Sequence, residues 1–210
     1  LMDFRVDQSR GMHFIYLLPF STTEALVEST LFTPQVEDED FYISAISDYL
    51  SRHLGLTEYD VVHRERGVIP LGVMPRHDPH IPGIGGNGGA IRPSSGYAFA
   101  FIQKQIDRAI AGACNSGLAV SMPHQAIDLW MDAVLLHVLR QFPQLAPDLF
   151  LRMAAALTGD EFATFLSGEA GWRLRLKVIL AMPKWPFLKA GVRLVLANPG
   201  LSVRGRRAWT

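Results

Sequence analysis

The stretch from Gly85 to Tyr97 holds five glycines in thirteen residues and leads into an apolar segment of helical period. Glycine is concentrated where a backbone takes positive φ or passes close to a phosphate or a flat ring. The string Gly83–Gly88 also has the G-x-G-x-x-G spacing of a dinucleotide-binding turn, but Pro79 and Pro82 crowd its entry and Pro93 delays the helix that should follow. Two other interpretations stay open: a glycine-rich surface turn, and a loop whose amides reach a cofactor at a helix N-terminus.

The apolar patterns place strands first and helices after them. Two apolar runs of strand length, 13–18 and 25–32, flank a short polar connection and predict an antiparallel hairpin. One or two further strands are expected over 59–71, around Gly67. Helical spacing predicts helices over 37–54, 95–111, 124–142, 147–157, 161–166 and 172–198, the last interrupted by Pro183 and Pro186. The predicted fold class is therefore α+β.

The chain has 210 residues, of which 49% are hydrophobic and 19% charged, as is typical of a folded protein of one or two domains. Three regions are expected: a sheet domain with one helix (1–84), the glycine-rich loop with its helix (85–112) and a helical C-terminal region (113–210). The single cysteine, Cys114, favours a reducing compartment, and neither a signal peptide nor a membrane-spanning run is recognised. We expect a cytoplasmic protein, and the opening Leu1 suggests that an N-terminal part precedes the chain.

Glu28 is the strongest candidate for an acid in chemistry. Strand alternation puts it on one face with Leu26, Thr30 and Phe32. A carboxyl group among such neighbours would be desolvated, which raises its pKa and keeps it protonated near neutral pH, as a general acid requires. The alternative is a solvent-exposed glutamate on an edge strand.

The C-terminal part is basic and apolar at once. From Trp172 to the end there are nine basic residues and no acidic one. Aromatic and cationic residues interleave there: Trp172, Arg173, Arg175, Lys177, Lys184, Trp185, Phe187 and Lys189. This pattern is typical of a helix in a membrane interface, with its cations toward lipid phosphates, and a basic helix packed on the protein is the alternative. The apolar content is too high for a solvated basic arm, so no nucleic-acid partner is predicted.

The histidines do not predict a metal site. His77 and His80 lie three residues apart on a proline-rich loop, without a helix to align them. Neither H-E-x-x-H nor a cysteine pair completes a ligand set.

Four separated stretches together resemble the FAD-dependent lycopene β-cyclase family of bacterial type. They are Met2-Asp3-Phe4 with Asp7, Phe14–Ser21 followed by Ala25–Thr30, Glu65-x-Gly67-x-Ile69-Pro70, and the glycine stretch through Pro93-Ser94-Ser95-Gly96-Tyr97. In order and spacing they look like the middle and C-terminal portions of the family, from residue 1 to about residue 180.

The resemblance implies a flavoprotein fold of the glutathione-reductase type. In such proteins an N-terminal βαβ unit, which these 210 residues do not include, binds the ADP part of FAD. The chain would supply the substrate-side antiparallel sheet, a second loop that contacts the flavin, and the C-terminal helices. The implied cofactor contacts are Gly85, Gly86, Gly88, Gly89, Pro93, Gly96 and Tyr97. FAD would be used in its reduced form, with NAD(P)H as the electron source.

The resemblance also implies a reaction, the non-redox cyclisation of the linear ψ-ends of lycopene to the β-rings of β-carotene, with Glu28 as the family's acid. Because the C40 substrate dissolves only in lipid, peripheral association with a membrane is expected. Where the family commonly has a second acid, this chain has Ser29, which bears on the end group formed or on activity. The alternatives are a related FAD-dependent isoprenoid reductase or monooxygenase, and a non-catalytic membrane-binding fragment.

Overall fold

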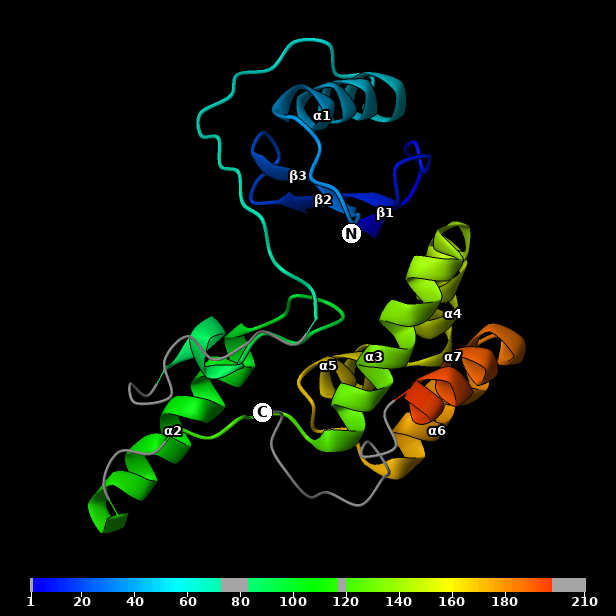
Figure 1. The fold of residues 1–210 in the computed structure, drawn as a ribbon. Coiled ribbons are helices and arrows are strands. Elements are labelled where there is room, and N and C mark those ends of the chain that lie inside the picture. The colour runs from blue at the N-terminus through cyan, green and yellow to red at the C-terminus, as the bar shows by residue number, and fades with distance from the viewer. Residues whose placement is uncertain (1, 73–82, 117–119, 198–210) are drawn as a thin grey trace. The chain divides into compact units, whose positions relative to one another are not determined.

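The computed structural model of the chain describes residues 2–72, 83–116 and 120–197. Within them, three β-strands come first and seven α-helices follow, so the predicted α+β class is confirmed (Figure 1). The chain divides into two compact units, Leu1–Val68 with Phe142–Pro147, and Ile69–Gln141 with Asp148–Thr210. The division into three regions that the sequence suggests stays a prediction.

The first unit is a small antiparallel sheet with one helix on it. Its strands, β1 (Met2–Asp3), β2 (Met12–Pro19) and β3 (Ala25–Phe32), pair in the order β1-β2-β3. The predicted hairpin of β2 and β3 is confirmed, and the Phe20 N–H closes its turn by donating to the Glu24 carbonyl (2.8 Å). The two-residue strand β1 is too short to be recognised from its sequence pattern.

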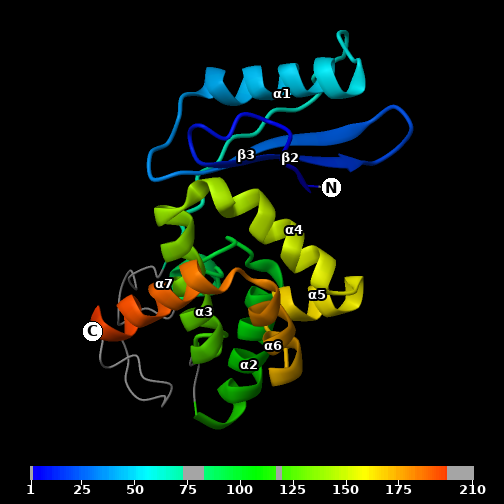
Figure 2. The ribbon, with the colours of Figure 1, turned by 90° about the vertical axis from the view of Figure 1, so that its right-hand side faces the viewer.

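Helix α1 (Glu39–Leu54) covers one face of this sheet (Figures 1 and 2). Asp38 caps its start, where the carboxylate accepts from the Phe41 N–H (3.0 Å). Gly55 ends the helix in the left-handed conformation, with a φ of 67° that glycine adopts without strain. The helix predicted over 37–54 is therefore confirmed, with a start two residues later.

The core of the first unit lies between α1 and the sheet. Ile15, Tyr49 and Leu50 are buried there, and each such side chain contributes about 1.5–3 kcal/mol. The Arg5 guanidinium donates to both carboxylate oxygens of Asp3, and the Tyr49 hydroxyl donates to Asp3 Oδ2 (2.9 Å). These hydrogen bonds, those from Arg5 first, hold the pKa of Asp3 well below its usual range.

Residues 57–71 form neither helix nor strand, so the strands predicted over 59–71 are wrong. The side chains of 57–70 are exposed, and Val62 reaches 85% exposure. A strand needs a partner for its backbone groups and a surface for its apolar face. Within the described part of the chain, the sheet holds only β1, β2 and β3, and the segment has neither.

The remaining helices follow along the chain. Their bounds are α2 (Phe99–Ser116), α3 (Ala126–Gln141), α4 (Ala146–Ala156), α5 (Gly159–Leu166), α6 (Trp172–Ala181) and α7 (Lys184–Ala197), with 3₁₀ turns η1 (Gly85–Gly88) and η2 (Pro143–Leu145). In the second unit, Leu157, Phe165, Ala170 and Val178 form a buried cluster around which α5 and α6 pack. Helix α7 lies along α3, where a Cβ added to Gly191 would stand 3.7 Å from the Trp130 ring.

Helix boundaries differ from the predicted ones at Pro186 and at both ends of α2. Pro183 separates α6 from α7, as predicted, but Pro186 does not break α7. It sits in the first turn of α7, where a proline has no helical hydrogen bond to lose. The helix expected behind a Ser94 or Ser95 cap starts only at Phe99, and it continues beyond Gly112.

Two buried ion pairs join α3 to the rest of the second unit. Asp128 and Asp132 lie one turn apart on the same side of α3, and both are buried. The Arg175 Nε, from α6, donates to Asp128 Oδ1 (3.0 Å). The Arg92 Nε, from the loop after η1, donates to both carboxylate oxygens of Asp132 at 3.2 Å.

Candidate functional site

The sheet face opposite α1 carries Glu28. Cross-strand pairs put Glu28 opposite Tyr16, Thr30 opposite Phe14 and Leu26 opposite Leu18. Since directly paired residues share a face, these six residues with Met12 and Phe32 form one surface, here called the aromatic face. The prediction that Glu28 has apolar strand neighbours is confirmed.

Glu28 itself is exposed on this face. The Thr30 hydroxyl donates to its Oε1 (2.6 Å) and orients the carboxyl group. The expected desolvation is not found, because β3 is the edge strand and one side of Glu28 remains open to water. Its role as an acid stays a prediction.

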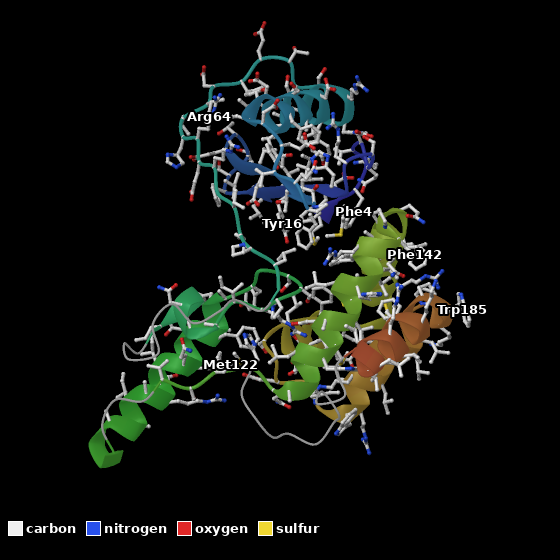
Figure 3. All side chains as sticks on the ribbon, viewed as in Figure 1. Phe4, Tyr16, Arg64, Met122, Phe142 and Trp185 are labelled. Atoms are coloured by element: carbon white, nitrogen blue, oxygen red, sulfur yellow. The ribbon has the colours of Figure 1, made fainter. Side chains whose placement is uncertain are left out.

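Aromatic rings line the face beside Glu28. The rings of Phe14 and Tyr16 meet edge to face, with centroids 4.9 Å apart and planes at 88°. Phe4 and Phe32 pack on the buried Phe14 at 5.4 and 6.1 Å. Figure 3 shows Phe4 and Tyr16 projecting from the sheet on the side away from α1. Burial, and then the charge of Glu28, raise the pKa of Tyr16.

Ser29 points to the other side of the sheet. Its Oγ lies 2.9 Å from the Nε2 of His13, which is 1% exposed beneath α1. The His13 Nδ1 lies 3.0 Å from the Asp7 carbonyl oxygen, so Nδ1 carries the proton and Nε2 accepts from Ser29. Burial lowers the pKa of His13. The residue after Glu28 therefore belongs to the α1 side and not to the aromatic face.

The predicted cofactor residues of the glycine stretch all lie in one loop of the second unit. Gly85, Gly89 and Gly96 have φ of 72°, 75° and 73°, which only glycine adopts freely. A Cβ on Gly88 would come within 2.3 Å of the Gly83 carbonyl oxygen. Glycine is thus required by the folding of the loop on itself, as the surface-turn interpretation predicts.

The amides of this loop are mostly used within the protein. Gln105, fully buried on α2, accepts from the Gly85 N–H (3.0 Å) and donates to the Gly88 carbonyl (2.7 Å). The N–H groups of Gly89 and Ala90 donate to carbonyls inside the loop. No helix opens at Gly88, so the loop is not a dinucleotide-binding turn. Contact of this loop with a flavin stays a prediction.

Arg92 anchors the far end of the loop. Besides Asp132, its guanidinium donates to the Phe165 carbonyl (2.8 Å), and the Ser94 hydroxyl donates to Asp132 (2.7 Å). Pro93 is buried between them, whereas the Tyr97 ring is 39% exposed. Of the predicted cofactor residues, Tyr97 therefore has the side chain that a ligand can reach.

Helices α6 and α7 each carry a stripe of exposed apolar side chains. The stripes consist of Trp172, Leu176, Ile179 and Leu180 on α6, and of Trp185, Leu188, Val192, Val195 and Leu196 on α7. A spacing of three or four residues keeps each stripe on one side of its helix. Exposed apolar stripes of this kind are typical of surfaces that meet a partner or a membrane.

The cations of this region are not all free to meet lipid. Arg175 is buried in its pair with Asp128, so its predicted place among the lipid-facing cations is wrong. Lys177 pairs with Glu161, while Arg173 and Arg193 are exposed. The basic residues of this region therefore include Arg175, which is buried in an ion pair, and other cations whose side chains are exposed.

Two findings concern metal binding and membrane spanning. Among the described residues, no three histidine, cysteine or carboxylate side chains gather where they could hold a metal ion, and His77 and His80 lie outside these residues. Over the same ranges, no helix has both the length and the apolar character needed to cross a membrane.

Sequence reasoning missed Tyr16, Arg92, Asp132 and Gln105. Tyr16 could have been found by counting the strand register outward from the hairpin turn. Asp132 had a signal too, because Asp128 and Asp132 share one side of a mostly apolar helix. Gln105 contacts Gly85 and Arg92 contacts Asp132, which lie 20 and 40 positions away in the sequence, so no local pattern predicts these contacts.

Comparisons with known proteins agree on one family. A family model described as "Lycopene cyclase protein" matches residues 1–191. A lycopene beta-cyclase of Paracoccus sp. (strain N81106 / MBIC 01143) is 34% identical over 116 residues, which are 51% of this chain and 29% of that protein. A lycopene beta-cyclase of Pantoea ananas is 25% identical over 203 residues, or 90% of this chain and 53% of that protein.

A plant protein is also similar: neoxanthin synthase of Solanum tuberosum is 31% identical over 97 residues, 46% of this chain and 20% of that protein. The chain spans about half the length, or less, of these curated relatives. No solved structure matches the chain. The family model includes both the strand of Glu28 and the glycine loop, and the chain therefore belongs to the lycopene cyclase family.

Proposed function

We propose that this chain is the substrate-binding and acid-bearing part of a lycopene β-cyclase, an isomerase of the intramolecular-lyase type. The observation that carries the proposal is a carboxyl group, Glu28, set among aromatic and aliphatic side chains on one sheet face. Family membership supports a carotenoid substrate, since the similar proteins of Paracoccus and Pantoea are lycopene beta-cyclases. A long hydrocarbon suits such a face because it offers no heteroatom for polar groups to bind.

The chemistry requires an acid. The only functional groups of lycopene are C=C bonds, so ring closure starts with a proton that Glu28 donates to a terminal alkene. The alkene π electrons form the new C–H bond and leave a tertiary carbocation. The next double bond attacks that cation, closes a six-membered ring and leaves the positive charge on a ring carbon. Loss of a ring proton to a base, either the Glu28 carboxylate or water, restores a C=C bond. The formula of the substrate is unchanged, as the absence of net redox change requires.

Substrate binding would supply the desolvation that the free sheet lacks. Leu18 and Leu26, at 43% and 42% exposure, lie next to Tyr16 and Glu28 on the aromatic face and extend toward the hairpin turn. A polyene lying on them would exclude water from Glu28. The pKa of a carboxyl group rises when water is removed, so the acid would become protonated when its substrate arrives.

FAD in its reduced form, with NAD(P)H as electron source, is proposed as the cofactor of the complete protein, together with a flavoprotein fold of the glutathione-reductase type. The resemblance of the sequence motifs to the FAD-dependent lycopene β-cyclase family supports it. A reduced flavin supplies negative charge that stabilises a nearby cation electrostatically. The glycine loop would contribute mainly the exposed Tyr97, because its glycine amides are largely engaged within the protein.

The test of the cyclase is a glutamine at position 28. In lycopene-producing cells, the complete protein should make β-carotene, and Glu28→Gln should leave lycopene uncyclised while the protein stays folded. Glu24→Gln is the matched control, because Glu24 is exposed in the same hairpin turn. Wild-type turnover by Glu28→Gln would refute the assignment. A product heavier or lighter than lycopene would instead identify a monooxygenase or a reductase.

We further propose that the exposed stripes of α6 and α7 rest on an anionic membrane surface. The segment from Trp172 to Ala197 carries basic but no acidic residues, so its charge complements anionic headgroups. A substrate that dissolves only in lipid also requires that the enzyme works at a membrane surface. In flotation with phosphatidylglycerol vesicles, Leu188→Gln with Val192→Gln should reduce binding. Leu151→Gln, on α4 and 63% exposed, is the matched control. Equal binding of all variants would favour the alternative of a docking site for protein.

A further inference from the structure

We propose that Tyr16 is a further catalytic residue of the cyclisation, whose ring face stabilises the carbocation formed beside Glu28. The inference rests on the proposed function. It adds a second group to the site, on a different strand from the acid.

The strand register brings Tyr16 and Glu28 together. They are direct cross-strand partners of β2 and β3, on the face away from α1. The Cβ atoms of such partners lie about 4.5–5.5 Å apart. The alkene carbon of the substrate that takes a proton from Glu28 therefore lies within reach of the Tyr16 ring. A cation is attracted to the π face of an aromatic ring when it lies within about 6 Å of the ring centroid.

The Tyr16 ring is held in place by its surroundings. The buried Phe14 meets it edge to face at 4.9 Å, and Phe14 is itself packed by Phe4 and Phe32. Burial raises the pKa of Tyr16 and the charge of Glu28 raises it further, as expected for a phenol and a carboxylate that are cross-strand partners. A ring fixed in this way needs no reorganisation when the cation forms.

The electron balance explains why an aromatic group is needed. After Glu28 has given its proton to the alkene, a carboxylate remains beside a tertiary cation, and collapse of that pair would give an ester. Among the strand residues of the aromatic face, Glu28 is the only one with a carboxyl group. The π face of the Tyr16 side chain stabilises the cation without forming a bond to it, so the next alkene can attack the cation and close the six-membered ring.

The experiment varies the electron density of the ring while its shape is kept. In the complete enzyme, position 16 is replaced by phenylalanine and by its mono-, di- and trifluorinated forms, and kcat is measured with lycopene in vesicles. We expect Tyr16→Phe to stay within a few-fold of wild type and kcat to fall stepwise with each fluorine, by roughly tenfold overall. KM and Tm should not change.

The same series at Phe41 is the control, because that ring stacks on His13 on the α1 side of the sheet. A flat series at position 16, with wild type active and Glu28→Gln inactive, would overturn the role of Tyr16 and leave the cyclase assignment standing. If wild-type protein forms no ring from lycopene, both inferences fail.

Discussion

The Ser29 hydroxyl lies 2.9 Å from the Nε2 of His13, on the side of the sheet that α1 covers. Glu28, its neighbour in sequence, faces Tyr16 on the opposite side. Two adjacent strand residues cannot share a face, because side chains alternate along a strand. A second acid after the glutamate would therefore meet His13 and not the substrate.

Ser29→Asp should change the histidine and leave the product unchanged. An aspartate at this place would favour the imidazolium form and raise the pKa of His13. The measurement is an NMR titration of His13 together with product analysis, with Ser29→Ala as the control that adds no charge. A changed end group in Ser29→Asp would contradict the assignment of position 29 to the α1 side.

Stability should fall when the medium becomes mildly acidic. Burial lowers the pKa of His13, while an unfolded histidine titrates near about 6.5. Between these values the unfolded state binds more protons, so stability is present above pH ~6.5 and is lost as the pH falls. Between pH 7 and 5, His13→Gln should reduce the pH dependence of the free energy of unfolding measured in urea. Some dependence of the same sign remains from His124, whose pKa is also lowered by burial. The exposed His63→Gln should keep the wild-type slope.

Asp3→Asn should destabilise the first unit by about 1–3 kcal/mol at pH 7. The variant weakens the hydrogen bonds from Arg5 and Tyr49, and only the Tyr49 bond is buried. Because the pKa of Asp3 is lowered in the folded state, its contribution is present above about pH 4 and is lost as the pH falls. Thermal unfolding at pH 7 and pH 3 checks this, and an equal loss at both would contradict it.

Arg92→Met should destabilise the second unit by about 3–5 kcal/mol, because it leaves Asp132 buried without its partner. Burial already raises the pKa of Asp132. Adding Asp132→Leu should recover most of the loss, since both charges are then removed. Arg152→Met, which breaks an exposed pair with Asp148, should cost less than about 0.5 kcal/mol. Chemical denaturation of the wild type and these three variants makes the comparison.

Replacing Gln105 should loosen the glycine loop. Gln105 bonds both ends of η1, and Gln105→Leu would leave the Gly85 N–H and the Gly88 carbonyl without their partner. We expect faster amide hydrogen exchange at Gly85 to Ala90 and a loss of about 1–3 kcal/mol in stability. The exposed Gln103→Leu, on the same helix, is the control.

The sequence by itself determined the elements and the family. Period-2 alternation gave the hairpin and the face of Glu28, and helical spacing gave α1 and α3 to α7 within a few residues. These patterns are local, so they can be read from neighbouring residues. The four motifs gave the lycopene cyclase family, because their residues lie in the chain itself.

Only the tertiary structure decided what those residues touch. Residues 57–71 have no partner strand, and the glycines of the loop are required by the folding of the loop itself. Arg175 is buried against Asp128 and does not face lipid. The tertiary structure also set Tyr16 against Glu28 and Ser29 against His13. The side-chain pairs Tyr16–Glu28, His13–Ser29 and Asp128–Arg175 join residues from 12 to 47 positions apart. Their energies depend on burial and register, which are properties of the packed chain and not of any local pattern.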